Sequence, residues 1–419
     1  MSTSYTCPRC CHVLVISTAV KCNNDARIVE TLANAGTGFD CASPAEIDLV
    51  LGAGAKPHDI VYAHPIKPVP HLQQASASGV HYTVVDSMAE LDKLAAYAPN
   101  ARVLLRLAVD DEGSMCQFSA KFGAHEATVP DLLRHAAKLG VDIVGISYHV
   151  GSGCYTIATY ENALEMARRV FDVAYSQGQP LWMLDMGGGF PGCSKGMWEP
   201  ALEGRTTFPE IARAISTKLD QLFPADSVSA EAGTPLRVIA EPGRYFVQDV
   251  AVLGTRVEGV RRASENGVAG VGVGGQDRVY LSDGVYGALN NVVHDHAQPN
   301  PMPISTAVQM AGPMAIDAAL RLGIPKDGVV PCSVWGPTCD SVDKIDGDAY
   351  LPRLDPGSWM IFAASGAYTH VAGSQFNGFG AMDRTYVEAH EAWDVEVTPE
   401  LQPELQSVVE SAMYMEEYR

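Results

Sequence analysis

Three short stretches place reactive or charged side chains next to turns. AVKCNN (19–24) has Lys21 directly after an apolar run, AEPGRY (240–245) has Glu241 and Arg244 after another, and WGPTCD (335–340) sets Cys339 beside Asp340. A desolvated lysine loses proton affinity and can form a Schiff base with an aldehyde. An arginine offers a fork of donors to a phosphate, and a buried carboxylate can pair with a protonated ring nitrogen.

A glycine run supplies a further component of the same chemistry. In LDMGGGFPG (184–192), Gly187, Gly188 and Gly189 follow an apolar run, so that backbone N–H groups can approach an anion closely. A tight turn is the alternative interpretation. The run lacks the lysine of an ATP-binding loop and the spacing of the dinucleotide fingerprint, which favours a phosphate group over a nucleotide.

YHVGSG (148–153) adds His149 and Ser152, and the imidazole offers a flat aromatic face. A reactive lysine, a phosphate cradle, an acid for a ring nitrogen and a flat partner are what pyridoxal 5'-phosphate (PLP) requires. PLP is therefore the predicted cofactor.

The elements that must position these residues alternate between strands and helices. Apolar, β-branched runs occur at 12–20, 59–64, 81–86, 102–109, 142–150, 181–186 and 236–241. Helical patterns separate them at 26–36, 88–98, 129–140 and 159–178. Such alternation predicts an α/β fold with a parallel sheet. Because polar residues follow each strand, a (β/α)8 TIM-like barrel is favoured over an open doubly wound sheet, although only seven strands are counted.

The chain after about residue 247 has a different pattern. Strand-like runs between Gly, Pro and Asp turns predict a β-rich domain, with one helical stretch at 314–323 and a glycine-rich loop at 263–277. The predicted domains are a PLP-binding barrel (12–246), a β-sandwich or barrel-like domain (247–395) and an acidic tail (396–419).

Composition excludes several other classes of function. The chain has 49 acidic and 29 basic residues, a net charge of −20, and no basic run of the kind that binds nucleic acid. No apolar stretch reaches the roughly 18 residues of a membrane span. Ten irregularly spaced cysteines indicate reduced thiols in a cytoplasmic protein. Cys7, Cys10 and Cys11 resemble half a zinc site, but without a second ligand pair no metal is expected.

Eight stretches in order resemble one known family. They are AVKCN, GTGFDCAS, SYHVGSGC, LDMGGGFPG, AEPGRYF, SDGVYG, VWGPTCDSVD and GAYT, and together they resemble the eukaryotic ornithine decarboxylases, which are fold-type III PLP-dependent decarboxylases. The resemblance implies a barrel plus a β domain and a head-to-tail homodimer with shared active sites. It also implies a carboxy-lyase activity (EC 4.1.1.-) that converts a basic L-amino acid of the ornithine or lysine type to a diamine and CO2, in polyamine or specialised-metabolite biosynthesis.

The resemblance also implies a role for each matching residue. Lys21 would be the Schiff-base lysine, flanked by Asp40 and Glu46, with Arg106 in the polar network around it. His149 would stack on the cofactor ring, Glu241 would pair with its nitrogen, and the phosphate would be held by Ser152, Gly187, Gly188, Gly189, Arg244 and Tyr368. Cys339 would govern reprotonation of Cα, and Asp340 and Asp295 would meet the distal ammonium of the substrate. Lys121 and Asp343 would form an intersubunit ion pair.

Two departures from the family pattern leave questions open. His294 in VVHDHA (292–297) stands where animal members usually have tyrosine, which is either tolerated variation or a change in substrate preference. Only 20 residues precede Lys21, fewer than in the family, where that segment supplies a barrel strand and a piece of the β domain. A missing or atypical first strand is therefore expected.

Two other functions remain as alternatives. One is a catalytically inactive homologue that acts as a regulatory binding protein, which would lose cofactor or trans-site residues. The other is a racemase or a diaminopimelate decarboxylase, although the pair of Cys339 and Asp340 suits a cationic substrate tail better than a carboxylate.

Overall fold

The computed structural model describes residues 5–6, 13–192, 205–224, 228, 231–263, 275–303, 329–380 and 382–386. The chain divides into two compact units, one of residues 1–193 and 204–248 and the other of residues 194–203 and 249–419. The predicted helix at 314–323, the predicted tail at 396–419 and the three N-terminal cysteines lie outside the described residues. So does most of the predicted glycine-rich loop.

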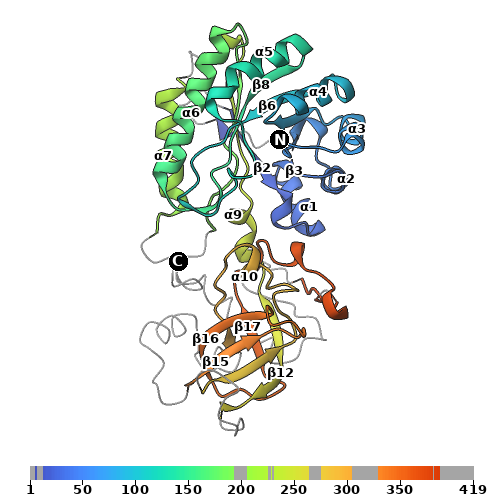
Figure 1. Cartoon of the computed structure of the whole chain (residues 1–419), viewed down its shortest axis with the longest axis vertical. Coiled ribbons are helices and arrows are strands. Elements are labelled where there is room, and N and C mark those ends of the chain that lie inside the picture. The colour runs from blue at the N-terminus through green and yellow to red at the C-terminus, as the bar shows by residue number, and fades with distance from the viewer. Residues whose placement is uncertain are drawn as a thin grey trace. The chain divides into compact units, whose positions relative to one another are not determined.

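The first unit is a closed barrel of eight parallel strands (Figure 1). Around the barrel the order is β2 (Val13–Ala19), β11 (Arg237–Ala240), β10 (Met183–Asp185), β8 (Asp142–Ser147), β6 (Arg102–Arg106), β5 (Tyr82–Val85), β4 (Ile60–Tyr62) and β3 (Gly38–Cys41). β2 pairs in parallel with both β11 and β3, which closes the sheet. A closed barrel confirms the predicted fold class and excludes the open doubly wound sheet. A short strand, β1 (Tyr5–Thr6), pairs antiparallel with β2.

The count of seven strands was one short, and the expectation of a missing first strand was wrong. The eighth strand is β3, the GFDC segment, which sequence reasoning treated only as a motif. It has four residues and includes a glycine and an aspartate, which are disfavoured in strands. Gly38 is required because a Cβ there would lie 2.5 Å from the carbonyl oxygen of Asp59.

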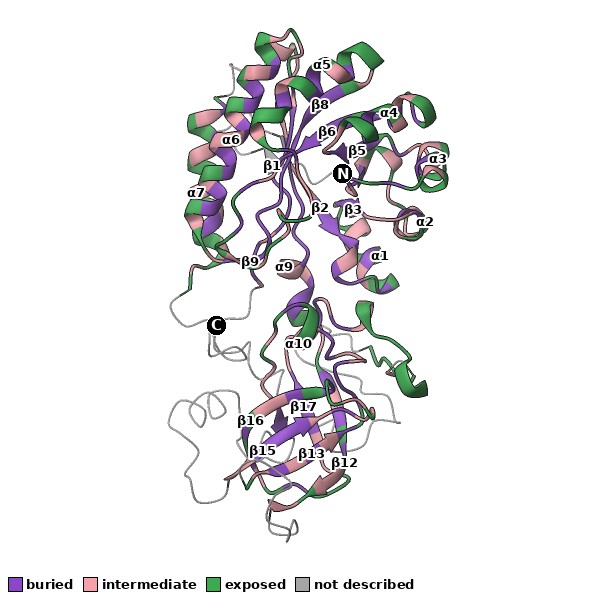
Figure 2. Ribbon diagram, viewed as in Figure 1, coloured by how far each residue is buried: buried purple, intermediate pink, exposed green. Residues whose placement is uncertain are grey.

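Helices surround the barrel, with their inner faces buried against the strands and their outer faces exposed (Figure 2). They are α1 (Ala26–Asn34), α2 (Pro44–Gly52), α3 (Val69–Ala77), α4 (Met88–Tyr97), α5 (Val129–Leu139), α6 (Ile157–Ser176) and α7 (Phe208–Leu222). Their ends follow local chemistry: α7 begins with a capping box of Thr207 and Glu210, and α5 ends at Gly140 with φ 71. Val103, Leu105 and Leu184 are fully buried in the main core, between strands and helices.

Shorter elements complete the barrel unit. The antiparallel pair β7 (Ser114–Cys116) and β9 (Ser152–Cys154) lies beside the C-terminal ends of the barrel strands, and α9 (Arg244–Val247) follows β11. One-turn 3-10 helices are η1 (Val20–Cys22), η2 (Pro57–Asp59), η3 (Glu126–Thr128) and η5 (Gln248–Val250). None of the helices in the described part of the chain is long and apolar enough to cross a membrane.

The second unit is built on a six-stranded sheet. In order across the sheet the strands are β14 (Met302–Pro303), β17 (Trp359–Phe362), β12 (Leu253–Arg261), β13 (Asp277–Leu281), β15 (Val329–Trp335) and β16 (Lys344–Pro352). Neighbouring strands are antiparallel except β13 and β15, which are parallel. The helices described in it are α10 (Asn291–His294), η7 (His370–Ala372) and η8 (Phe376–Gly378). Its own core includes Val334, Met360 and Leu281, so it is a β-rich domain as predicted.

Candidate active site

Lys21 lies in η1, directly after β2, at the C-terminal end of the barrel. Its ammonium donates to Oδ2 of Asp40 on the neighbouring strand β3. The Asp40 side chain is fully buried, whereas 38% of the Lys21 side chain is exposed. The buried carboxylate therefore binds the amine from the interior side and leaves it accessible to a ligand that enters the barrel mouth.

His149 follows β8, and its burial favours the neutral imidazole. Its Nδ1 accepts a hydrogen bond from the Gly151 N–H at 3.1 Å, and the ring of Phe118 packs edge-on against it. Burial, with the nearby positive charges of Arg106 and Lys21, lowers the pKa of His149 well below its ordinary value. A neutral, held imidazole is suited to contact a flat ring without adding charge.

The glycine turn after β10 requires glycine at each of its three positions. Gly187 (φ 60) and Gly189 (φ 102) have left-handed conformations, and a Cβ at Gly187 would lie 2.1 Å from the carbonyl oxygen of Tyr148. A Cβ at Gly188 would lie 2.8 Å from the carbonyl oxygen of Glu241 and 3.0 Å from Nε2 of His149. The turn thus lies against both His149 and Glu241, and a side chain at any position would fill that space.

Arg244 and Ser152 come together at the same end of the barrel. Arg244 is the first residue of α9, and its guanidinium donates to the Ser152 hydroxyl of β9 at 3.1 Å. A serine hydroxyl, an arginine fork and backbone N–H groups of a glycine turn are the donors that proteins use for a phosphate dianion. The three groups are separate in the sequence, but the barrel brings them to one end.

Glu241, at the end of β11, shares its buried surroundings with a second acid, Asp185. Asp185 accepts hydrogen bonds from the Ser147 hydroxyl at 2.8 Å and the Gly187 N–H at 2.9 Å, and it also hydrogen-bonds Glu241. Burial, followed by the charges of Asp185 and Asp40, raises the pKa of Glu241 well above its ordinary value. Burial likewise raises the pKa of Asp185, to about 6. Two adjacent buried carboxyls cannot both ionise easily, so the pair retains a proton.

This pair makes a pH-dependent contribution to stability. Between about pH 4 and pH 6 the folded chain keeps the Asp185 proton that the unfolded chain has lost, so the free energy of unfolding falls as pH rises through this window. Asp185→Asn removes the part of this effect that is due to Asp185. Relative to wild type, we expect the free energy of unfolding of this variant to be higher by on the order of 2 kcal/mol at pH 7.5 and almost unchanged at pH 4. Urea unfolding of the cofactor-free chain measures this, with exposed Asp142→Asn as the matched control. An equal difference at both pH values would contradict it.

The residues at this end of the barrel fit PLP. Among the described residues, Oε1 of Glu241 and Oδ1 of Asp40 are buried without a hydrogen-bond partner. An unpartnered carboxylate oxygen deep in the mouth suits a protonated ring nitrogen, and the donors around the glycine turn suit the phosphate. Lys21 would hold the aldehyde carbon. Sequence reasoning placed Lys21, Asp40, Arg106, His149, Ser152, Gly187, Gly188, Gly189, Glu241 and Arg244 in one site, and the barrel unit brings these ten residues to one end.

Apart from Glu46 and Lys121, which lie in the barrel unit, the remaining predicted residues belong to the β unit. Cys339 is exposed, and its N–H donates to Oδ1 of Asn377 at 3.0 Å. Oδ2 of Asp340 accepts from the Tyr286 hydroxyl at 2.6 Å, and this bond is the first cause of the lowered pKa of Asp340. The ring of Phe376 stacks on that of Tyr286 with centroids 4.5 Å apart. The turn thus presents a thiol beside an ionised carboxylate and two aromatic rings.

Four other predicted residues of this unit differ in their exposure. Asp295, which directly follows α10, is buried, and the adjacent His294 is exposed. Tyr368 has φ 54, a left-handed conformation that a tyrosine rarely adopts and that constrains where its side chain points. Asp343 is 1% exposed and accepts hydrogen bonds within its own unit.

Sequence reasoning missed several residues that belong to these constellations. Asp185 stands two residues before the glycine run, and its position at the end of β10 was the available signal. Tyr286 lies in the quoted SDGVYG motif but received no role, and nothing local marked Phe376 or Asn377. Glu46 was expected to flank Lys21 with Asp40: its carboxylate accepts the Ala42 N–H at 2.6 Å near the start of α2, and burial raises its pKa, on which the charges of Asp40 and Lys21 also act.

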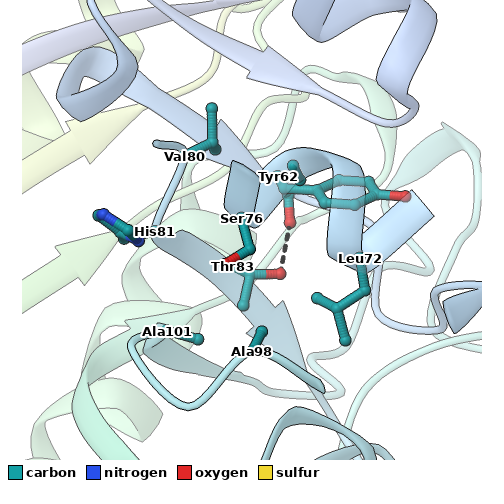
Figure 3. Close-up of a pocket in the computed structure, with 9 residues that line it drawn as sticks. Tyr62, Leu72, Ser76, Val80, His81, Thr83, Ala98 and Ala101 are labelled. Carbon is teal, nitrogen blue, oxygen red and sulfur yellow. Dashed lines mark hydrogen bonds between the residues drawn. The ribbon is translucent and has the colours of Figure 1, made fainter. Parts of the chain in front are cut away.

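A pocket outside the barrel has different chemistry. It lies between α3, β4, β5 and the end of α4, and its lining includes Tyr62, Leu72, His81 and Ala101 (Figure 3). The Thr83 hydroxyl donates to the Tyr62 carbonyl oxygen across it at 2.9 Å. No acidic side chain, lysine or arginine lines it, so it offers none of the groups found at the barrel mouth.

Comparison with known proteins agrees with this geometry. The family model of the pyridoxal binding domain of pyridoxal-dependent decarboxylases matches residues 9–248. Ornithine decarboxylase of Mus pahari is 38% identical over 384 residues, covering 90% of this chain and 76% of that protein. Antizyme inhibitor 2 of Xenopus laevis is 38% identical over 378 residues with the same coverage.

A solved structure shows the same similarity in three dimensions. The crystal structure of the Paramecium bursaria Chlorella virus arginine decarboxylase matches with a TM-score of 0.73 and 33% identity, over 88% of each chain. The family match covers the whole barrel, from β2 to α9, and includes every residue of the barrel-mouth site. The chain therefore belongs to the family of pyridoxal-dependent decarboxylases.

Proposed function

We propose that the chain catalyses the PLP-dependent decarboxylation of a basic L-amino acid of the ornithine or lysine type to the corresponding diamine. One observation carries the proposal: the accessible Lys21 ammonium, held by buried Asp40, shares the barrel mouth with a phosphate-type cradle and with Glu241. When bound, PLP withdraws electrons from the substrate Cα, which makes loss of CO2 feasible.

The side chains of the barrel would divide the work of binding and orientation. Arg244, Ser152 and the glycine turn would hold the phosphate, Glu241 the ring nitrogen and neutral His149 the ring face. Asp40 keeps Lys21 oriented toward the mouth and balances the positive charge of its ammonium group. Cys339 would hold the proton that Cα receives after CO2 has left.

The β unit supports a cationic substrate tail. Asp340 and Asp295 are acids, and the hydrogen bond from Tyr286 helps to keep Asp340 ionised. A distal ammonium would be attracted to such groups, whereas the distal carboxylate of diaminopimelate would be repelled. The similar proteins named ornithine decarboxylase and arginine decarboxylase act on basic amino acids, which agrees with this charge argument.

An inactive regulatory homologue is the second candidate, because the chain is also similar to an antizyme inhibitor. Lys21, Glu241 and Arg244 are all present and meet at the barrel mouth, and the turn keeps both Cys339 and Asp340. The enzyme is therefore favoured. Activity separates the two candidates: purified protein with PLP should release CO2 from ornithine or lysine but not from leucine or glutamate. No turnover of any basic amino acid would favour the regulator.

The active site would be completed by a second copy of the chain in a cytoplasmic homodimer. This proposal rests on the resemblance, in which the turn carrying Cys339 and Asp340 enters the site of the other subunit. The ion pair of Lys121 with Asp343 of that subunit stays a prediction. The burial of Asp343 within its own unit argues against this ion pair, because a partner lysine would have to reach a buried carboxylate.

His294 provides a test of substrate choice. An exposed imidazole beside Asp295 would replace a tyrosine at the substrate tail, and it changes both the length and the polarity of that surface. If His294 selects the substrate, His294→Tyr should shift the ratio of kcat/KM for ornithine over lysine by about tenfold, equivalent to about 1.4 kcal/mol. Steady-state kinetics with both amino acids measures it, and an unchanged ratio would show that His294 is tolerated variation.

A further inference from the structure

Asp343 joins two segments of the β unit that are far apart in sequence. Its Oδ1 accepts the Val285 N–H at 2.9 Å, across 58 residues. Its Oδ2 accepts the Thr338 N–H at 2.9 Å and the Thr338 hydroxyl at 2.7 Å. Within the described part of the chain no lysine or arginine pairs with it, so backbone and hydroxyl donors satisfy this buried carboxylate.

The two joined segments carry the polar side chains of the proposed substrate-tail site. Tyr286 follows Val285 directly, and Cys339 and Asp340 follow Thr338. The Tyr286 hydroxyl reaches Asp340 at 2.6 Å, and the Asp343 N–H donates to the Asp340 carbonyl oxygen at 3.1 Å. The position of Asp340 relative to Tyr286 therefore depends on the carboxylate that holds both segments.

Two glycines, Gly284 and Gly336, pack directly against this carboxylate. A Cβ at either Gly284 or Gly336 would lie 2.2 Å from Oδ1 of Asp343. The first segment has a similar anchor of its own, because Asp283 accepts the Gly284 N–H at 2.7 Å and the Ala288 N–H at 3.0 Å. Both turns are thus built closely around buried carboxylates, and only glycine fits beside Asp343.

We infer that Asp343 is a positioning residue: it holds Tyr286, Cys339 and Asp340 in one arrangement from within its own subunit. This inference rests on the proposed function, since it assigns the arrangement to binding of the substrate tail. It differs from the intersubunit ion pair expected from the resemblance, in which Asp343 would face Lys121 of a second copy.

Asp343→Asn tests the positioning role. The amide keeps the size but presents N–H to one of the two sets of donors, so one segment is released. We expect KM for the basic amino acid to rise at least tenfold while kcat changes less. Asp348→Asn, an exposed change on β16, the strand that follows Asp343, should leave both constants unchanged.

A double-mutant cycle distinguishes positioning from general destabilisation. If Asp343 acts by holding the contact between Tyr286 and Asp340, the loss in Asp343→Asn combined with Tyr286→Phe should be clearly smaller than the product of the single losses. Fully multiplicative losses would overturn the inference. Rescue of a Lys121→Asp variant by Asp343→Lys would also overturn it and establish the ion pair.

One readout does not require activity. Hydrogen exchange of the Val285 and Thr338 amides should accelerate in Asp343→Asn and not in Asp348→Asn. Unchanged protection of both amides would contradict the inference even if the chain proved to be a decarboxylase. Faster exchange in a chain with no decarboxylase activity would contradict only the proposed function.

Discussion

Lys21→Ala is expected to abolish decarboxylation, with a fall in kcat of about a thousandfold or more, because no other described lysine occupies the barrel mouth beside Asp40. Mass spectrometry of the borohydride-treated wild type should place PLP on the peptide containing Lys21. The exposed Lys56→Ala is the matched control and should keep full activity.

The Lys21 substitution also leaves buried Asp40 without the ammonium that it now holds. Loss of activity through misfolding is therefore excluded by a second variant, Lys21→Ala with Asp40→Asn, which removes the uncompensated buried charge. Circular dichroism and oligomeric state should match those of wild type. Retention of substantial turnover in folded Lys21→Ala protein would contradict the assignment.

Mixing two inactive variants is expected to restore activity. If one site takes Lys21 from one chain and Cys339 from another, Lys21→Ala mixed with Cys339→Ala gives heterodimers with one intact site of two. Random reassortment of equal amounts should recover about a quarter of wild-type activity. The measurement is CO2 release after subunit exchange, followed with two affinity tags.

The control for the mixture contains no intact site in any combination. Cys339→Ala is mixed with the double variant Lys21→Ala, Cys339→Ala, and this mixture should stay inactive. If subunits exchange but the first mixture also stays inactive, Cys339 does not act across subunits, and the proposed shared site fails.

The barrel could be predicted because its signals are local. Seven strands are continuous apolar runs, and the polar residues after them identified the end where ligands bind. β3 was missed because a four-residue strand with a glycine and an aspartate has no apolar run of its own. Its membership is decided by pairing with β2 and β4, which is a long-range property of the closed barrel.

The residues of the candidate site also fall into a group that local sequence identifies and a group that only long-range contacts identify. Lys21, the glycine run and Arg244 were recognisable from residue type and from their position after strands. The roles of Asp185 and Asp343 depend on what packs around them: Asp185 meets Glu241 from another strand, and Asp343 meets Val285 from a segment 58 residues away. No pattern in one stretch of sequence can show such contacts.

The most direct test of the proposed activity uses ornithine and lysine labelled with carbon-13 at the carboxyl group. With PLP, the purified chain should release labelled CO2 and the unlabelled diamine in equal amounts, and in heavy water the diamine should carry one deuterium at the carbon that lost CO2. Release from neither substrate, or labelled CO2 without a diamine, would contradict the assignment of this chain as a basic amino-acid decarboxylase.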